Sequence, residues 1–136
     1  MTKREADVFA CFADTVVAPG GKLPPLARTD AVTYLDALLE ASPRANRAGI
    51  RFALHALEVG PRLLGFGQRM RQLSPERRLA YLDRLSASPA GFALQGMEVM
   101  AKLAYYGDDG VMRTLGYDSD AVVARAREVR LAEARW

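Results

Sequence analysis

The chain has 136 residues, of which half are hydrophobic and about a quarter are charged, and its formal net charge is +3. This length and balance are typical of one globular domain, so we expect residues 1–136 to form a single domain. A chain of this size buries roughly two-thirds of the surface that its unfolded form exposes, and it needs no metal or disulfide to hold a core. Its one cysteine, Cys11, excludes an internal disulfide, and together with one histidine, His55, it cannot complete a closed His/Cys metal site.

The sequence contains no run of about 18 apolar residues, so we expect no membrane-spanning helix. The first residues, Met1 to Asp7, are charged and periodic where an export leader would have an apolar stretch. A lone free thiol suits a reducing compartment. These features favour a cytoplasmic location.

The first expected helix runs from Lys3 to about Val17, and Thr2 with Glu5 forms the pattern of a capping box before it. Residues 18–28 follow, and their glycines and prolines predict the longest irregular connection, which is a candidate for partner contact. Asp30 then caps a short helix that ends near Glu40.

Serine-proline pairs mark the next three helix starts. Ser42 and Pro43 open a helix that runs to Val59, where Gly60 and Pro61 are expected to stop it. The pairs at 74–75 and 88–89 open the two helices that follow.

The last expected elements follow Tyr106. They are one helical turn over residues 111–115 and a terminal helix that Asp118 or Ser119 caps and that runs to about Arg135. Its large aliphatic residues form only a thin stripe, so it is either frayed or completed by another chain. We therefore predict an all-α, single-domain bundle of five or six helices with a long Pro/Gly-rich first loop.

The residues expected in the core recur at helical spacing. They are Val8, Phe9, Phe12, Ala13, Val16, Val32, Leu35, Leu38, Leu39, Phe52, Ala53, Ala56, Leu57, Leu79, Leu82, Leu85, Leu94, Met97, Met100, Leu103 and Ala104.

His55 and Cys11 are the two residues with nucleophile or base chemistry that stand alone in the sequence. A catalytic histidine needs a nucleophile and an orienting partner, so a packed or half-exposed His55 is the favoured interpretation. An enzyme that acts through His55 alone remains a third hypothesis, and it requires a pocket at that residue. Cys11 lies in an apolar run and is expected to be buried and inert.

A basic stretch extends from Arg62 to Arg84, where six arginines face two acids, for a local charge of +4. Such a surface could bind the phosphates of nucleic acid, pair with an acidic protein partner, or simply be solvated. Nucleic acid is the less favoured partner, because Phe66 and Tyr81 are not interleaved with the arginines as a stacking platform requires.

Three of the five tyrosines, Tyr105, Tyr106 and Tyr117, lie within 13 positions that contain two glycine turns. Tyrosine in turns is common on binding surfaces, because the ring supplies contact area at low entropic cost. Tyrosines that cover the core of their own domain would give the same pattern, so both interpretations stay open.

Four segments, spread in order over nearly the whole chain, carry a family resemblance: residues 12–17 with Pro19, residues 31–36, residues 73–77, and the tyrosine segment 105–117. With these motifs the chain resembles the gluconate 2-dehydrogenase subunit 3 family, the small non-catalytic subunits of flavoprotein dehydrogenases of the glucose-methanol-choline class. Two departures stand out: the twin-arginine leader of many members is missing, and the family's glycine-rich continuation is shortened to residues 109–112.

The resemblance implies an accessory subunit that docks on an FAD-dependent oxidoreductase and supports its folding, flavin retention or stability. FAD and the catalytic residues would then belong to the large subunit, and this chain would hold no cofactor or metal and have no activity alone. The alternative is a basic helical module that binds nucleic acid or an acidic protein. The partner interface is expected at Tyr105, Tyr106, Asp108, Arg113, Tyr117, Arg77 and Trp136.

Overall fold

The computed structural model describes residues 1–133; Trp136, which was predicted at the interface, lies outside the described residues. Within that range the chain is all-helical, which confirms the predicted class, and it forms seven α-helices where five or six were expected. The elements are α1 (Lys3–Val17), η1 (Leu26–Arg28), α2 (Ala31–Ala41), α3 (Arg44–Leu63), η2 (Met70–Gln72), α4 (Pro75–Ser86), α5 (Gly91–Tyr106), α6 (Asp109–Thr114) and α7 (Ser119–Glu133). Over residues 1–133, no helix combines the length and apolarity needed to cross a membrane.

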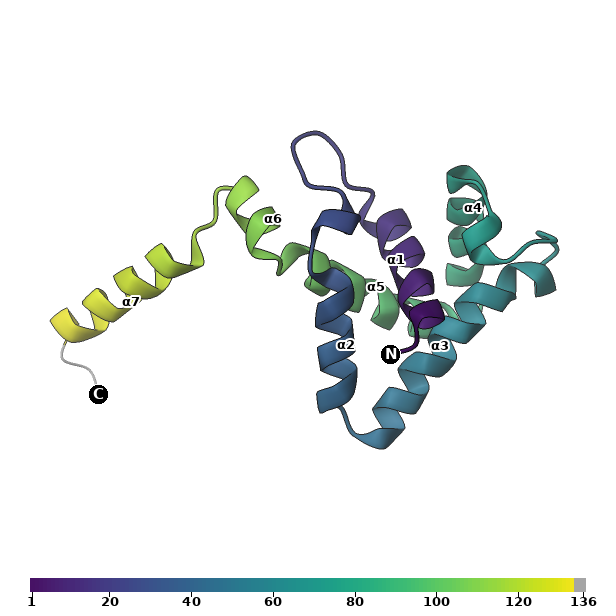
Figure 1. Ribbon diagram of the computed structural model, residues 1–136, viewed down its shortest axis with the longest axis horizontal. Helices are drawn as coiled ribbons and strands as arrows, with labels where there is room; N and C mark the ends of the chain where they lie inside the picture. Colours follow the sequence, from purple (N-terminus) through teal and green to yellow (C-terminus); the bar gives the residue numbers. More distant parts are fainter. Residues whose placement is uncertain (134–136) are drawn as a thin grey trace.

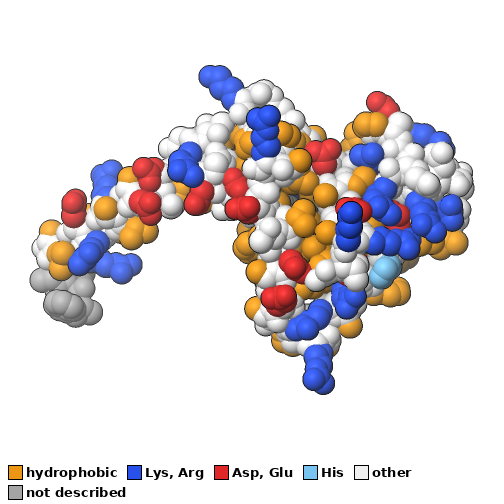
Figure 2. Space-filling view, in the orientation of Figure 1, with side chains coloured by type: hydrophobic (Ala, Val, Ile, Leu, Met, Phe, Trp, Pro, Cys, Tyr) orange, Lys and Arg blue, Asp and Glu red, His pale blue; other side chains and the backbone are white. Residues whose placement is uncertain are grey.

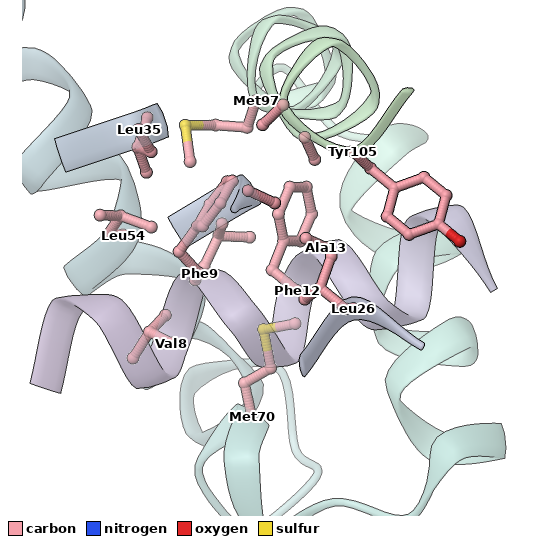
Figure 3. Packing of buried hydrophobic residues seen from close by; sticks show 14 of the residues in the cluster. Val8, Phe9, Phe12, Ala13, Leu26, Leu35, Leu54, Met70, Met97 and Tyr105 are labelled. Atoms are coloured by element: carbon pink, nitrogen blue, oxygen red, sulfur yellow. The ribbon is translucent and has the colours of Figure 1, made fainter. Parts of the chain in front are cut away.

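Helix α1 is the centre of the fold, and α2, α3, α4 and α5 pack around it (Figure 1). Its stripe of Val8, Phe9, Phe12 and Ala13 is buried as predicted. Figure 3 shows the two phenylalanine rings surrounded by residues from α2, α3, η2 and α5. Because this stripe contains two aromatic rings, α1 supplies enough apolar area to hold four other helices.

The predicted core is wrong for α3, α4 and α5 at four positions. The side chains of Phe52, Ala56, Leu79 and Leu103 are exposed, Phe52 to 74% of its surface. Helix α3 turns a different face toward α1, the face of Leu54, Leu57, Glu58 and Pro61. Both faces of α3 carry apolar residues, so periodicity alone could not tell which one is covered.

Helix α3 continues through Gly60 and Pro61 to Leu63, so the predicted stop at Val59 is also wrong. Gly65, just beyond the C-cap Leu64, stops the helix instead and has φ +85°. The N–H of Phe66 donates to the carbonyl of Pro61 at 2.8 Å, and the N–H of Gly65 donates to that of Arg62 at 3.4 Å, the pattern of a Schellman motif.

Two of the serine-proline pairs act differently from the prediction. The Ser42 hydroxyl donates to the carbonyl of Leu38 at the end of α2, and α3 begins only at Arg44 without a side-chain cap. Helix α5 begins at Gly91, three residues after Ser88. Only Pro75 occupies the first position of a helix, as predicted.

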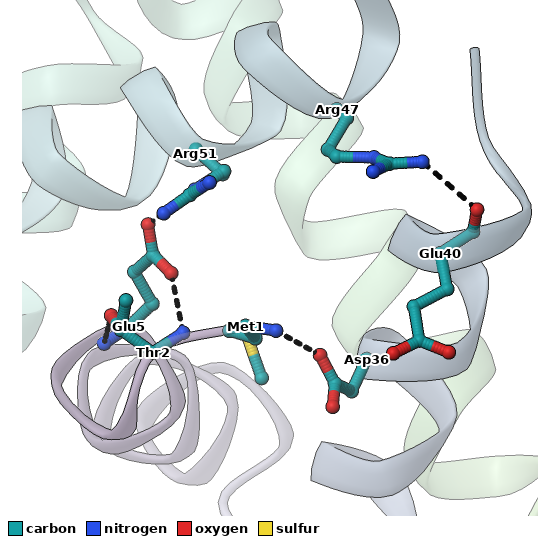
Figure 4. Close-up of polar contacts among 7 residues, drawn as sticks. All are labelled: Met1, Thr2, Glu5, Asp36, Glu40, Arg47 and Arg51. Carbon is teal, nitrogen blue, oxygen red and sulfur yellow. Dashed lines mark hydrogen bonds and ion pairs between the residues drawn. The ribbon is translucent and has the colours of Figure 1, made fainter. Parts of the chain in front are cut away.

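Two buried carboxylates, Glu5 and Glu58, join the helices around α1. Glu5 completes the predicted capping box with Thr2, and the Nε of Arg51 on α3 donates to it at 2.7 Å (Figure 4). Burial alone would raise the pKa of Glu5, but the Thr2 backbone N–H and the Arg51 guanidinium outweigh it and lower the pKa to about 2. Glu58 accepts from Arg71 at 3.1 Å, and this hydrogen bond raises the pKa of the Arg71 guanidinium. Each carboxylate is thus a charged link between α3 and a segment remote in sequence.

Candidate partner-binding surfaces

Helix α7 stands away from the rest of the molecule (Figure 1), and every described side chain from Asp120 to Ala132 is exposed. The Asp118 carboxylate caps it by accepting the N–H groups of Asp120 and Ala121 at 3.0 and 3.1 Å. Val122 and Val129 lie on one face, seven residues apart. Figure 2 shows apolar and charged side chains mixed along this helix, so α7 presents a thin apolar stripe that nothing within the described chain covers.

Helix α6 connects this projecting helix to the body, and hydrogen bonds to the Asp108 carboxylate stabilise the connection. One Asp108 oxygen accepts the N–H groups of Gly110 and Val111, and the other accepts the N–H of Asp30 at the start of α2 at 2.9 Å. Burial would raise the pKa of Asp108, but these three N–H groups outweigh it and hold the pKa below its ordinary value. Asp108, predicted to contact a partner, therefore already has a structural role.

Tyr105 was predicted at the interface and is instead a core residue, with 0% of its surface exposed. Its hydroxyl donates to the carbonyl of Pro24 at 2.6 Å and so anchors the Pro/Gly-rich loop. Its ring meets that of Tyr106 edge to face, with centroids 5.2 Å apart. The α5 turn points Tyr105 inward and leaves Tyr106 partly exposed, so one tyrosine fits the core interpretation and the other remains available.

Tyr117 and Arg113 lie near the start of α7 and are both exposed. Helix α6 ends at Thr114 and is followed by Gly116, which has φ +82°, and the Tyr117 N–H donates to the carbonyl of Met112 at 2.9 Å. This Schellman motif terminates α6 and sets the direction in which the chain continues through Tyr117 to α7. Tyr106, these residues and α7 belong to one continuous segment, residues 106–133, which we call the α6–α7 arm.

Arg77 does not belong to that surface. It lies at the start of α4, and α4 and α6 are at opposite sides of the molecule in Figure 1. Its guanidinium lies 5.9 Å from the centroid of the Phe66 ring and donates to the Phe66 carbonyl at 2.9 Å. Arg77 therefore lies apart from Arg113 and the other residues predicted at the interface, because the chain folds around α1 between them.

The basic stretch 62–84 is only partly a free surface. Arg71 pairs with Glu58 and Asp7. Arg78 and Arg84 donate to the backbone carbonyls of Leu73 and Leu64. Figure 2 shows Lys and Arg side chains gathered over α3 and the segment before α4. Several of these cations thus hold the chain's own loops in place.

A groove between α3, α4 and α5 is the feature that sequence reasoning missed. It encloses about 420 Å³ and is lined almost entirely by apolar residues. Small residues, including Ala53, Ala56 and Ala93, lie along it, and the exposed Phe52 and Leu63 (82%) stand beside them. The available signal was that apolar residues on α3 occupy more than one face, which indicates either a buried helix or a second contact.

His55 and Cys11 do not form a site. The His55 side chain is 56% exposed, with its Nε2 3.6 Å from a Glu5 carboxylate oxygen, and it does not line the groove. A catalytic role for His55 alone requires a pocket at this residue, and its exposed position does not supply one. Cys11 is half-buried, and burial raises the pKa of its thiol. Among the described residues, no group of three or more His, Cys, Asp or Glu side chains could hold a metal ion.

No family profile, curated protein or solved structure matches the chain.

Proposed function

We propose that this chain is a non-catalytic accessory subunit that binds and stabilises an FAD-dependent oxidoreductase of the glucose-methanol-choline class in the cytoplasm. The family resemblance of the four motifs indicates the class of partner protein. The α6–α7 arm is the observation that carries the proposal.

Helix α7, the distal part of the arm, supports a binding role because it adds no described buried side chain to the core. From Asp120 to Ala132 no described side chain is buried, although the helix is capped and carries an apolar stripe. An isolated helix of 15 residues is marginally stable in water, so α7 gains most of its stability when its stripe is covered. A partner that covers it would order the arm and bury Tyr106 and Tyr117 with it.

In this proposal FAD and hydride transfer belong to the large subunit. The small chain contributes by binding the folded, flavin-loaded form of its partner more tightly than the unfolded form, which raises the folded fraction by mass action. Flavin retention then depends on the arm.

Co-expression with a flavoprotein of this class from the same genome tests the proposal. We expect a complex on size exclusion and a higher flavin-to-protein absorbance ratio than for the flavoprotein alone. Val122→Asp with Val129→Asp should weaken both, because two charges enter the apolar stripe. Ala121→Asp with Ala124→Asp is the matched control, since it adds two charges away from the line of Val122 and Val129 on α7 and removes no large aliphatic residue.

The absence of a complex with the wild-type chain, together with unchanged flavin content, would overturn the proposal. A salt-dependent shift of generic DNA or RNA by the chain alone, lost in Arg77→Glu with Arg78→Glu, would favour the nucleic-acid alternative instead.

A further inference from the structure

The α3–α5 groove lies on a different part of the molecule from the α6–α7 arm. It is formed by most of α3 from Gly49 onward, the second half of α4 and the first half of α5, whereas the arm begins at the end of α5. Isolated exposed apolar residues are ordinary on protein surfaces, but a continuous apolar hollow marks a binding site. The groove therefore needs an explanation that the arm does not supply.

The shape of the groove fits a helix. Its α3 wall extends from Gly49 to Leu63, which is about 21 Å at 1.5 Å per residue, or about four helical turns. Gly49, Ala53 and Ala56 recur along this wall at intervals of four and three and leave room for another helix to approach closely. Phe52 stands exposed beside them as a contact residue.

A small polar ligand fits less well. Sites for small molecules combine an apolar lining with several placed polar groups. Here the Tyr81 hydroxyl is the polar side-chain group among the lining residues, and burial raises the pKa of Tyr81 to about 12. One neutral hydroxyl cannot orient a charged metabolite, whereas a peptide helix satisfies its own backbone and needs only apolar contact.

Arginine side chains at one end of the groove indicate which charge a bound helix should carry. At the end of the groove formed by Leu64, Arg84 donates to the Leu64 carbonyl at 3.2 Å. Arg77 donates to the carbonyl of Phe66, two residues after Leu64, and Arg62 is two residues before Leu64 in the chain. Among the described residues, none of these three arginines has a carboxylate within ion-pair distance.

The acids near the groove do not cancel this charge. Two acids, Glu76 and Asp83, are the sequence neighbours of Arg77 and Arg84, against three arginines, and Glu98 on α5 lies 3.9 Å from Lys102. The end of the groove therefore carries net positive charge, and carboxylates on the occupant would complement it.

A second copy of this chain is the weaker choice of occupant. The chain has a net charge of +3, so two copies repel each other overall. On α7, its uncovered helix, three arginines are balanced by Asp120, Glu128 and Glu133, so this helix offers no net negative charge to the basic end of the groove.

We propose that the groove binds an amphipathic helix of the partner protein, one that presents large aliphatic side chains to Ala53, Ala56 and Leu63 and carboxylates to Arg62, Arg77 and Arg84. This inference rests on the proposed function, because the helix belongs to the flavoprotein that the α6–α7 arm also contacts. The two surfaces hold the partner at two points, and each adds to the affinity of the other.

Titration of the purified flavoprotein with variants of the full chain tests the groove. Ala56→Asp should weaken binding by at least about tenfold, because it places a charge in the apolar floor. Ala80→Asp on the exposed face of α4 is the matched control and should leave the affinity unchanged. Circular dichroism and the thermal midpoint establish that both variants fold.

A second pair of variants tests the charge. Arg62→Glu with Arg84→Glu should weaken binding, and should also flatten the dependence of the Kd on salt concentration. Arg4→Glu with Arg28→Glu, at two exposed arginines outside the groove lining, is the control for net charge. Hydrogen exchange of the complex should protect residues 49–63 of this chain and a helical flavoprotein segment that carries carboxylates.

The possible failures are distinguishable. If the wild-type chain forms no complex, the proposed function fails and the inference fails with it. If the complex forms and Ala56→Asp binds as tightly as Ala80→Asp, the groove inference alone is overturned. A dimer of the chain alone that Ala56→Asp dissociates would show that a second copy fills the groove and would overturn the inference, as would a protected flavoprotein segment without carboxylates.

Discussion

Helices α1 and α7 have the same length of 15 residues, and each begins at a side-chain cap, yet one is the centre of the fold and the other is exposed. The difference lies in the size of the apolar residues. Helix α1 presents Phe9 and Phe12 on its inner face, whereas α7 presents valine and alanine. A cap determines where a helix begins, but buried area determines whether it packs.

Helix α3 combines both situations in one element. Leu54 and Leu57 face α1 and are buried, while Phe52 and Leu63 on the same helix remain exposed. We read the covered face as the one that holds the body together and the uncovered face as the one left for a partner.

The largest expected effect contrasts the two helices directly. Phe12→Ala leaves a cavity around a fully buried ring and should cost about 3–5 kcal/mol of unfolding free energy. Val129→Ala should change it by less than about 0.5 kcal/mol, because its side chain touches little but solvent. Urea unfolding followed by circular dichroism measures both. A large loss for Val129→Ala would mean that α7 packs on the body in solution.

The next-largest expected change in unfolding free energy comes from comparing two glycines of α3. A Cβ atom at Gly60 would lie 2.4 Å from the Tyr81 hydroxyl oxygen, so Gly60→Ala should cost about 1–3 kcal/mol. At Gly49, a Cβ atom meets nothing within 4 Å, and Gly49→Ala should gain up to about 1 kcal/mol from helix propensity. The thermal midpoint measures both. Combining Gly60→Ala with Tyr81→Phe should recover most of the loss; if it does not, the hydroxyl is not the cause.

The third prediction concerns pH. The pKa of Glu5 is about 2 in the folded chain against an ordinary 4.5, so its ionised form stabilises the fold. That stability is complete above about pH 4.5 and is lost as the pH falls toward 2. Glu5→Gln should lose about 1–2 kcal/mol at pH 7 and show a flatter decline in acid, measured by urea unfolding between pH 7 and 2. Parallel curves for the two proteins would contradict this role.

The smallest effects come from the caps of the two helices. Thr2→Ala removes a capping hydroxyl from α1 and should lower the unfolding free energy by about 1 kcal/mol. Asp118→Ala removes the corresponding cap of α7 and should reduce helicity by circular dichroism at pH 7 without moving the thermal midpoint. If the midpoint falls with Asp118→Ala, α7 unfolds together with the body.

Much of the fold follows from local sequence patterns, and the candidate site follows much less. The capping box at Thr2, the inner face of α1 and the helix after Asp118 are all present where they were predicted. The predicted site is split: Tyr105 is buried, while Tyr106 and Tyr117 are exposed. The sequence does not distinguish two neighbouring tyrosines, and only the orientation of α5 determines which of them is buried and which is exposed.

The sequence by itself determined the all-α class, the position of most helix starts and the apolar stripe of α1, because caps and periodicity act over a few residues. The tertiary structure alone decided which face of α3 is covered, where Pro61 is tolerated, and that Arg51 meets Glu5 46 residues away. It also decided that the Tyr105 hydroxyl meets Pro24 across 81 residues, and that a groove stays open between α3 and α5. These outcomes depend on which of several apolar helix faces packs against α1, and a local sequence pattern does not carry that information.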